Sequence, residues 1–336
     1  SCPRGEIGRH KGLKILAHLG VPVRVWPRAP YNVIAKCMKV FDCTTFFNEN
    51  LMLEIRFNIL NKFVDKFVIA EAKYSHSGEK KKLNFDINKF PEFKKKIIYL
   101  IVENEPEKLI YEENKGQAYE KKSNMRMNSI LRIEHQRNSL LDSLNEASNN
   151  DYVFYSDNDE IPNFEKINLN NIKNKIIIFK QKLFYYKFNL HCNWVDWYGT
   201  KGCKKKDLLS FSWLREVKAK RYPFYRLDTL ISKNKYTNVE IVEDGGWHFT
   251  QLKKPKDIEI KLLNQEHHDE YKEAKDNLPN VEDLIKRKTI VYDYEANSSE
   301  YKYGKEFKLK TANMDLMPYF LQQNVEKYSE WFDFEK

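Results

Sequence analysis

The feature that most constrains this chain is a series of short apolar runs, each followed by an acidic residue. The runs are FVDKFVIA (63–70), IIYLIV (97–102) and YVFYS (152–156), followed by Glu71, Glu103 and Asp157. Strongly apolar runs of this length are typical of strands buried on both faces of a sheet. Helical patterns occupy the intervals, the longest over 117–147. We therefore predict an α/β fold with a mostly parallel central sheet and helices on both faces.

The composition excludes several classes of protein. Aromatic residues make up 14% of the 336 residues, which provides more apolar surface than a disordered chain has. No apolar stretch approaches the roughly 18 residues of a membrane-spanning helix, so we expect none. Five cysteines, an odd number, suit a reducing compartment. We predict a cytoplasmic location, with peripheral association at a membrane as an alternative.

The net charge of +10 is concentrated at the amino terminus, because the first 36 residues contribute +6. This opening, rich in Pro and Gly, resembles the peptide obtained when a tRNA gene is translated, and Met38 looks like the true start. We predict that residues 1–37 are a spurious or disordered extension; a basic targeting peptide is the alternative. Nucleic acid binding is therefore not expected from the charge.

The segment YVFYSDNDEIP at 152–162 is the sharpest local motif. Ligands of open α/β sheets bind at the carboxyl ends of strands, where Asp157 and Asp159 would lie. Two carboxylates at alternate positions can share a divalent cation, and hard oxygen ligands favour Mg²⁺ or Mn²⁺. The alternative is an ordinary acidic turn, because turns favour Asp and Asn.

Glu71 and Glu103 end the other two runs and extend the predicted acidic rim. Glu103 lies in the acidic segment ENEPE, which favours simple solvation. Glu71 precedes AKYSHSG, whose polar groups are suited to the neighbourhood of a bound nucleotide. We therefore keep Glu71 as a donor-binding candidate.

Arg137 interrupts an apolar stripe on the long predicted helix. The other members of the stripe, three or four residues apart, are Ile130, Ile133, Leu141 and Leu144. A guanidinium at such a position must reach solvent or meet an anion. A diphosphate, the acidic rim or a structural carboxylate could each be that anion.

The segment VEDGGWHFT at 242–250 is the second candidate cluster. Trp247 offers a stacking face and His248 can ligate a metal. Asp244 and Glu243 are candidate bases. The segment has a structural alternative, because a single histidine often packs in a core.

From Met38 to about residue 270 the chain resembles glycosyltransferase family 17, the family of the bisecting β-1,4-N-acetylglucosaminyltransferase. The matching pieces, in order, are KVFDCTTFFNENLMLEIRFNIL, VDKFVIAEAKYSHSG, HQRNSL, YVFYSDNDEIP and GWHF. The resemblance implies a GT-A-like fold with a Rossmann-type nucleotide-binding half and a DxD metal site. It also implies inverting transfer of N-acetylglucosamine from UDP-GlcNAc to a glycan acceptor, through a β-1,4 link as in protein N-linked glycosylation.

The resemblance assigns roles to individual residues. Asp157, Asp159 and Glu160 match the acidic segment of the family, with Asn158 in place of valine. The family's QRN segment matches Arg137 and Asn138, and its GWHF segment matches Trp247 and His248. The predicted donor-binding residues are Glu71, Arg137, Asn138, Asp157 and Trp247, and the predicted metal ligands are Asp157, Asp159 and His248. An inverting transfer also needs a base, for which Asp244 is preferred over Glu160.

These expectations divide the chain into the extension 1–37, a glycosyltransferase domain over 38–270 and a mainly helical extension over 271–336. Two alternatives stay open for function. One is transfer of another nucleotide sugar into a surface polysaccharide, and the other is a metal-dependent protein that binds or processes nucleic acid.

Overall fold

The computed structural model describes residues 38–110, 118–223, 225–264, 268–296, 300 and 302–334. The chain divides into two units, 1–37 and 38–336, and only the second contains described residues. The prediction for residues 1–37 lies outside the described residues. Within the described part, every helix is too short or too polar to cross a membrane.

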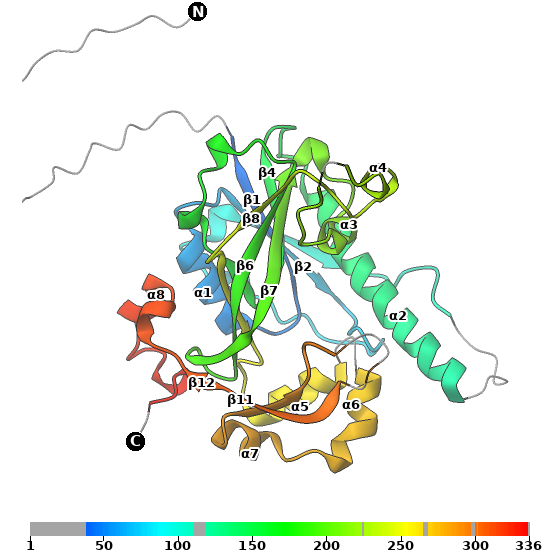
Figure 1. Cartoon of the computed structure of the whole chain (residues 1–336), viewed down its shortest axis with the longest axis vertical. Coiled ribbons are helices and arrows are strands. Elements are labelled where there is room, and N and C mark those ends of the chain that lie inside the picture. Colours follow the sequence, from blue (N-terminus) through cyan, green and yellow to red (C-terminus); the bar gives the residue numbers. More distant parts are fainter. Residues whose placement is uncertain are drawn as a thin grey trace, which may run out of the picture. The chain divides into compact units, whose positions relative to one another are not determined.

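Four parallel strands form one half of a 10-stranded mixed sheet (Figure 1). In the order β3-β2-β1-β4, they are β3 (Ile97–Val102), β2 (Lys66–Ala72), β1 (Val40–Phe46) and β4 (Tyr152–Asp157). The three predicted apolar runs are confirmed as strands, each within a few residues. Because all four strands run parallel, their carboxyl ends lie at one edge of the sheet.

The other half of the sheet is mixed, so the prediction of a mostly parallel sheet is correct only for the first half. β6 (Ile176–Tyr185) and β7 (Leu190–Lys204) form a long antiparallel hairpin, and β7 also pairs antiparallel with β4. The turn of this hairpin contains Tyr186, whose φ is 66°. The strands are β5 (Glu160–Pro162), β6 (Ile176–Tyr185), β7 (Leu190–Lys204), β8 (Val239–Val242), β9 (Gly246–Thr250) and β12 (Lys310–Thr311).

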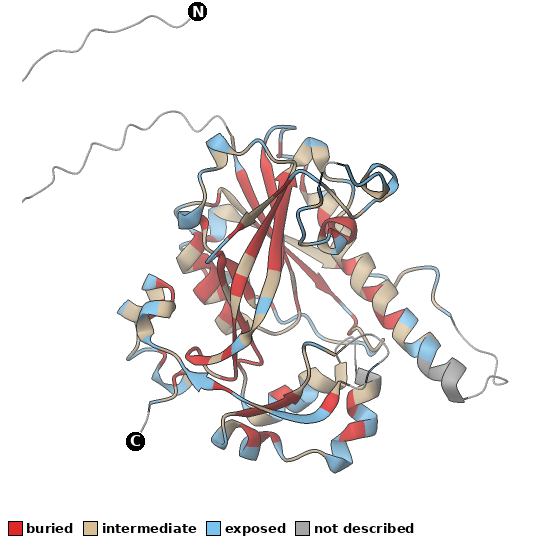
Figure 2. Ribbon diagram, in the orientation of Figure 1, coloured by how far each residue is buried: buried red, intermediate tan, exposed pale blue. Residues whose placement is uncertain are grey.

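Helices cover both faces of the sheet, as the sequence predicts. The covering helices are α1 (Asn50–Leu60), α2 (Ala118–Ser139), α3 (Phe211–Glu216) and α8 (Tyr319–Gln323), and the short α4 (Asp228–Ile231) follows α3. Side chains of β1 alternate: Val40 and Phe46 pack with α1 and α8, whereas Phe41 and Cys43 pack with α3 and the segment after α2. The strands between these layers are buried (Figure 2).

The carboxy-terminal part is not mainly helical, contrary to expectation. Besides α5 (Pro255–Asn264), α6 (His268–Ala274) and α7 (Val281–Lys286), it contains a two-stranded sheet of β10 (Thr289–Tyr292) and β11 (Tyr303–Lys308). These elements pack on β6 and β7 through a third apolar cluster. The predicted boundary at residue 270 therefore falls inside α6.

Candidate active site

A cavity of about 350 Å³ lies beside the carboxyl ends of β1 and β4. The parallel half contributes Thr45, Phe46 and Asp157 to its wall, and α2 contributes Gln136 and Arg137. Later parts of the chain contribute Asp159, Arg215, His248 and Lys261. The cavity therefore joins segments that lie far apart in the sequence.

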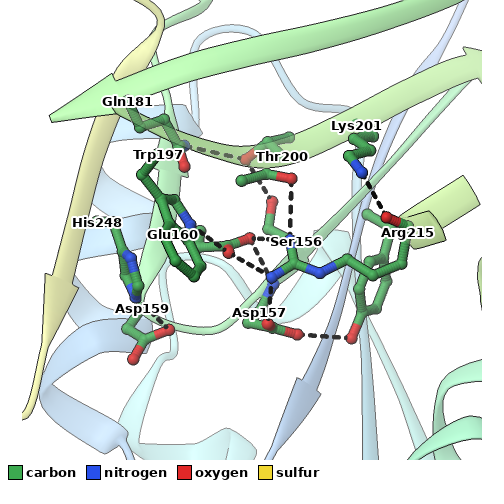
Figure 3. Close-up of polar contacts among 12 residues, drawn as sticks. Ser156, Asp157, Asp159, Glu160, Gln181, Trp197, Thr200, Lys201, Arg215 and His248 are labelled. Atoms are coloured by element: carbon green, nitrogen blue, oxygen red, sulfur yellow. Dashed lines mark hydrogen bonds and ion pairs between the residues drawn. The ribbon is translucent and has the colours of Figure 1, made fainter. Parts of the chain in front are cut away.

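Asp157 ends β4 and is held by two groups. The Tyr155 hydroxyl donates to Oδ1 at 2.9 Å, and Nη2 of Arg215 donates to Oδ2 at 2.9 Å (Figure 3). Burial raises the pKa of Asp157, but the opposing effects of Arg215 and Arg137 are larger in sum. The pKa of this carboxyl therefore lies below its usual range, and it is ionised at neutral pH.

Asp159 lies just beyond the strand end and faces a second cation. Nζ of Lys261, on α5, donates to Oδ2 at 3.1 Å, and Nε2 of His248 lies 3.5 Å from Oδ1. Burial opposes ionisation, but Lys261 and His248 together lower the pKa of Asp159 well below its usual range. The two aspartates predicted at this edge are thus both ionised and both line the cavity.

Glu160 is fully buried and does not line the cavity. Its carboxylate accepts hydrogen bonds from Nε1 of Trp197 at 2.7 Å and from Nη2 of Arg215 at 2.8 Å (Figure 3). The backbone N–H of Asp157 donates to its other oxygen at 3.1 Å. These donors hold the carboxylate inside the protein, so Glu160 does not face the cavity as a catalytic base would. It instead orients Asp157 and Arg215 through hydrogen bonds.

Arg137 lines the cavity, as its place in an apolar stripe suggests. Its Nε donates to the Tyr155 hydroxyl at 3.1 Å, and its guanidinium lies over the Tyr155 ring at 5.2 Å from the centroid. Among the residues that the structure describes, no carboxylate forms an ion pair with Arg137. It reaches Asp157 only through Tyr155, so the guanidinium is available to an anionic ligand.

Three predicted donor-binding residues, Glu71, Asn138 and Trp247, lie outside the cavity. Glu71 is fully buried and accepts from the backbone N–H groups of Asn84 and Phe85 and from the Tyr99 hydroxyl, and Lys81 pairs with it. This carboxylate fastens the segment after β2 to the sheet.

Asn138 also points away from the cavity. It accepts from the backbone N–H of Ser212 at 2.9 Å and so joins α2 to α3. It is one residue from Arg137, and adjacent positions on a helix do not face the same side.

Strand β9 separates Trp247 from His248, because successive side chains of a strand point to opposite faces. His248 lines the cavity, whereas Trp247 donates from Nε1 to the carbonyl of Leu316 at 2.6 Å and packs in the core. Asp244 precedes β9, is largely exposed and pairs with Lys182. Asp244 does not line the cavity. The residue predicted as the preferred base therefore lies away from Asp157, Asp159 and His248.

Arg215 and Lys261 were not among the predicted site residues. Each follows or interrupts an apolar segment, in FSWLRE and in IEIKLL. The criterion that singles out Arg137 would therefore have found both. What the sequence cannot show is that they meet Asp157 and Asp159, which lie 58 and 102 residues away along the chain.

Another part of the cavity lining is aromatic. It contains Tyr185, Trp197, Tyr292, Tyr294 and Tyr303, which come from the hairpin and the carboxy-terminal part. The Trp197 ring packs on His248 with centroids 4.5 Å apart, whereas Trp194 stacks on Phe307 outside the cavity. The cavity therefore has a charged side and an aromatic side.

Two of the predicted metal ligands already contact cations of the protein. Arg215 pairs with Asp157, and Lys261 with Asp159. Within the described residues, no group of three or more His, Cys, Asp or Glu side chains is arranged to hold a metal ion. The charge of the aspartates is thus balanced by Arg215 and Lys261 in this structure.

The fold and the site define an α/β protein with a cavity that offers cations to an anionic ligand and aromatic rings to an apolar face. The chain belongs to glycosyltransferase family 17, whose family model matches residues 28–331. It is therefore a glycosyltransferase, acting on a sugar donor and an acceptor.

Other comparisons add little to this assignment. No curated protein matches the chain. Among solved structures, the crystal structure of HddC from Yersinia pseudotuberculosis is similar over 62% of this chain and 91% of that one, at 8% identity and a TM-score of 0.29.

Proposed function

We propose that this glycosyltransferase moves N-acetylglucosamine from UDP-GlcNAc to a glycan acceptor, with inversion and a β-1,4 link. Membership of family 17 supports this donor and this link. The four parallel strands, with helices on both faces and a cavity at their carboxyl ends, support a GT-A-like arrangement with a Rossmann-type nucleotide half.

Arg137 is the observation that carries the proposal. A half-buried guanidinium at the cavity wall, hydrogen-bonded to a tyrosine hydroxyl and not to a carboxylate, is suited to a diphosphate. Arg215 and Lys261 add positive charge to the same wall. Together they would stabilise the negative charge that develops on UDP as it leaves.

In the proposed reaction, an acceptor hydroxyl oxygen attacks the anomeric carbon of the donor sugar. The bond from this carbon to the β-phosphate oxygen breaks, and its electron pair leaves with UDP. The hydroxyl proton passes to a base. The aromatic wall of Trp197, Tyr292 and Tyr294 is suited to the apolar face of the acceptor sugar.

His248 is the best-placed candidate for that base. It lies between the charged and the aromatic walls, with Nε2 near Asp159 and the ring packed on Trp197. Its Nδ1 is buried and has no hydrogen-bond partner among the described residues. Because Nδ1 is enclosed by the protein, Nε2, which lies beside Asp159, is the nitrogen that would take the proton of the acceptor.

Binding of Mn²⁺ or Mg²⁺ stays a proposal. Asp157 and Asp159 offer the hard oxygen ligands that these ions prefer, and His248 offers a nitrogen beside them. A bound ion would neutralise the diphosphate and would compete with Lys261 for Asp159. Replacing Lys261 by methionine should therefore strengthen Mn²⁺ binding, measured by calorimetry without any donor.

The proposed donor site is tested by calorimetric titration with UDP-GlcNAc, with and without Mn²⁺, beside other UDP- and GDP-sugars. Arg137→Met should weaken binding roughly tenfold or more, since a charged hydrogen bond contributes about 1.5–3 kcal/mol. Arg287→Met is the matched control, because Arg287 pairs with Glu306 outside the cavity. Unchanged donor affinity in Arg137→Met would refute the proposed donor site.

The role of His248 is tested separately with His248→Asn. If His248 is the base, transfer should fall strongly while donor affinity and its dependence on Mn²⁺ persist. Loss of the Mn²⁺ dependence with donor binding otherwise intact would instead make His248 a metal ligand.

A further inference from the structure

A loop over residues 218–234 combines exposed aliphatic side chains with a high positive charge. It follows α3, whose Arg215 lines the cavity, and it includes α4. Figure 2 shows α4 exposed at the surface. Neither the reaction nor the packing of the core uses the side chains at its tip.

Hydrogen bonds hold the two ends of the loop. The backbone N–H of Lys218 donates to the carbonyl of Asn234 at 2.8 Å, which closes the loop. Nε1 of Trp213 donates to the carbonyl of Lys233 at 2.6 Å, and Nζ of Lys201 donates to the carbonyl of Val217 at 2.7 Å. These contacts hold both ends of the loop against α3 and the sheet.

The tip of the loop presents aliphatic side chains to solvent. Leu227, Leu230 and Ile231 are 74%, 82% and 90% exposed. Leu227 has helical backbone angles at the start of α4, so these residues, spaced by three and four, share one face of the helical turn. Single exposed aliphatic residues are ordinary, but three on one face mark an interaction surface.

Positive charge surrounds this apolar face. Residues 218–236 contain six Lys or Arg and a single acidic residue, Asp228, for a net charge of +5. Three of these cations, Lys220, Arg226 and Lys235, lie within 6.0 Å of the centroid of the Tyr222 ring. Asp228 pairs with two of them, Arg226 and Lys235.

We infer that the 218–234 loop docks the protein on an anionic lipid bilayer. Leu227, Leu230 and Ile231 enter the boundary between headgroups and acyl chains, while the surrounding lysines and arginines contact the lipid phosphates. This inference does not depend on which nucleotide sugar the enzyme uses.

Charge and side-chain chemistry favour lipid over two other partners. A symmetric dimer through this face would bring together two copies of the segment 218–236, each of net charge +5, which like-charge repulsion opposes. Single-stranded nucleic acid would stack its bases on exposed aromatic rings, and the loop offers Tyr225, which is 68% exposed. The three side chains that share one face of the helical turn are aliphatic, which favours lipid.

Sedimentation of the full chain with vesicles tests the inference. Vesicles of phosphatidylcholine with a quarter phosphatidylglycerol should bind the protein at least tenfold more tightly than phosphatidylcholine alone, and the difference should shrink as salt rises. Ile231→Ser should weaken binding by on the order of tenfold, because one aliphatic chain no longer inserts. Tyr319→Ser, at a 72% exposed position on α8, is the matched control and should bind as wild type does.

Two further variants keep the test decisive. Leu227→Ser with Leu230→Ser and Ile231→Ser should abolish vesicle binding with an unchanged melting temperature, because all three side chains are exposed. Lys220→Gln with Arg221→Gln should remove most of the preference for anionic vesicles. Wild-type binding by the triple variant would overturn the inference, as would a concentration-dependent dimer that the triple variant loses.

Discussion

Arg56 and Arg215 both form ion pairs with aspartates, but in different surroundings. Arg56, on α1, is fully buried under the sheet, where Nε donates to Asp42 at 2.7 Å and Nη2 to Ser156 at 2.9 Å. Arg215, on α3, keeps 19% of its side chain exposed and lines the cavity, where it donates to Asp157 and Glu160. The two arginines therefore differ in their access to a ligand and not in the kind of pairing: Arg56 is enclosed, and Arg215 faces the cavity.

Glu160 connects the two arginines. Its backbone carbonyl accepts from Nη1 of Arg56 at 2.6 Å, and its carboxylate accepts from Arg215. The buried pair of Arg56 and Asp42 thus holds the start of β5, from which Glu160 positions Arg215. The interior and the cavity wall thus belong to one hydrogen-bonded network. Substitutions at Arg56 and at Arg215 can show how much each arginine contributes to stability and to activity.

The largest expected effect is on stability and concerns the buried Arg56. Arg56→Met should lower the free energy of unfolding by about 3–5 kcal/mol, because it leaves Asp42 charged and unpaired in the core. The double variant Asp42→Leu with Arg56→Met should recover much of this loss, since an apolar pair leaves no buried charge. Denaturant unfolding followed by circular dichroism measures the stability of both variants. A loss below about 1 kcal/mol in Arg56→Met is what an exposed ion pair would give, and it would contradict a structural role for Arg56.

Arg215→Met should have a smaller effect on stability and a larger one on function. We expect the free energy of unfolding to fall by about 1–3 kcal/mol, because Glu160 keeps Trp197 and the Asp157 N–H as donors. Transfer should fall tenfold or more, since a cation facing the leaving group is lost. Arg215→Lys, which keeps the charge, should restore part of the activity. Full activity in Arg215→Met would place Arg215 with Arg56 among structural residues.

The smallest effect concerns Lys201, which donates to the backbone carbonyls of Arg215 and Val217. Burial, and then Arg215, lower the pKa of Lys201 from 10.5 to about 7. Between these values the unfolded chain binds more protons, so this group makes the free energy of unfolding rise with pH, by at most about 1.4 kcal/mol per unit.

Denaturation of the wild type and of Lys201→Met between pH 6.5 and 9 measures this contribution. The wild type should gain stability relative to the variant as the pH rises. Parallel pH profiles in the two proteins would mean that Lys201 keeps its ordinary titration.

Much of the fold could be predicted from the sequence. The apolar runs ending at Glu71, Glu103 and Asp157 are strands, and the long helical pattern contains α2. Local patterns suffice here, because the period of apolar residues reports whether a segment is a helix or a strand and which face is buried. The mixed half of the sheet was missed, since pairing direction depends on how distant strands meet.

The candidate site was predicted in part. Asp157, Asp159, Arg137 and His248 line one cavity, as the motifs suggest, whereas Asp244, Asn138 and Trp247 do not. Alternation along a strand and rotation along a helix separate neighbours such as Trp247 and His248. The sequence predicted a site at this strand end but not which neighbouring residues share it.

What the sequence by itself determined is the series of strands and helices and the acidic ends of those strands. Only the tertiary structure decided which acidic end lines the cavity. Glu71 and Asp157 follow equivalent apolar runs, yet Glu71 is enclosed by donors of the segment after β2, and Asp157 opens on a cavity with Arg215 beside it. Apolar periodicity is a local property, whereas the partner of a carboxylate can arrive from a distant segment and only meets it when the chain is folded.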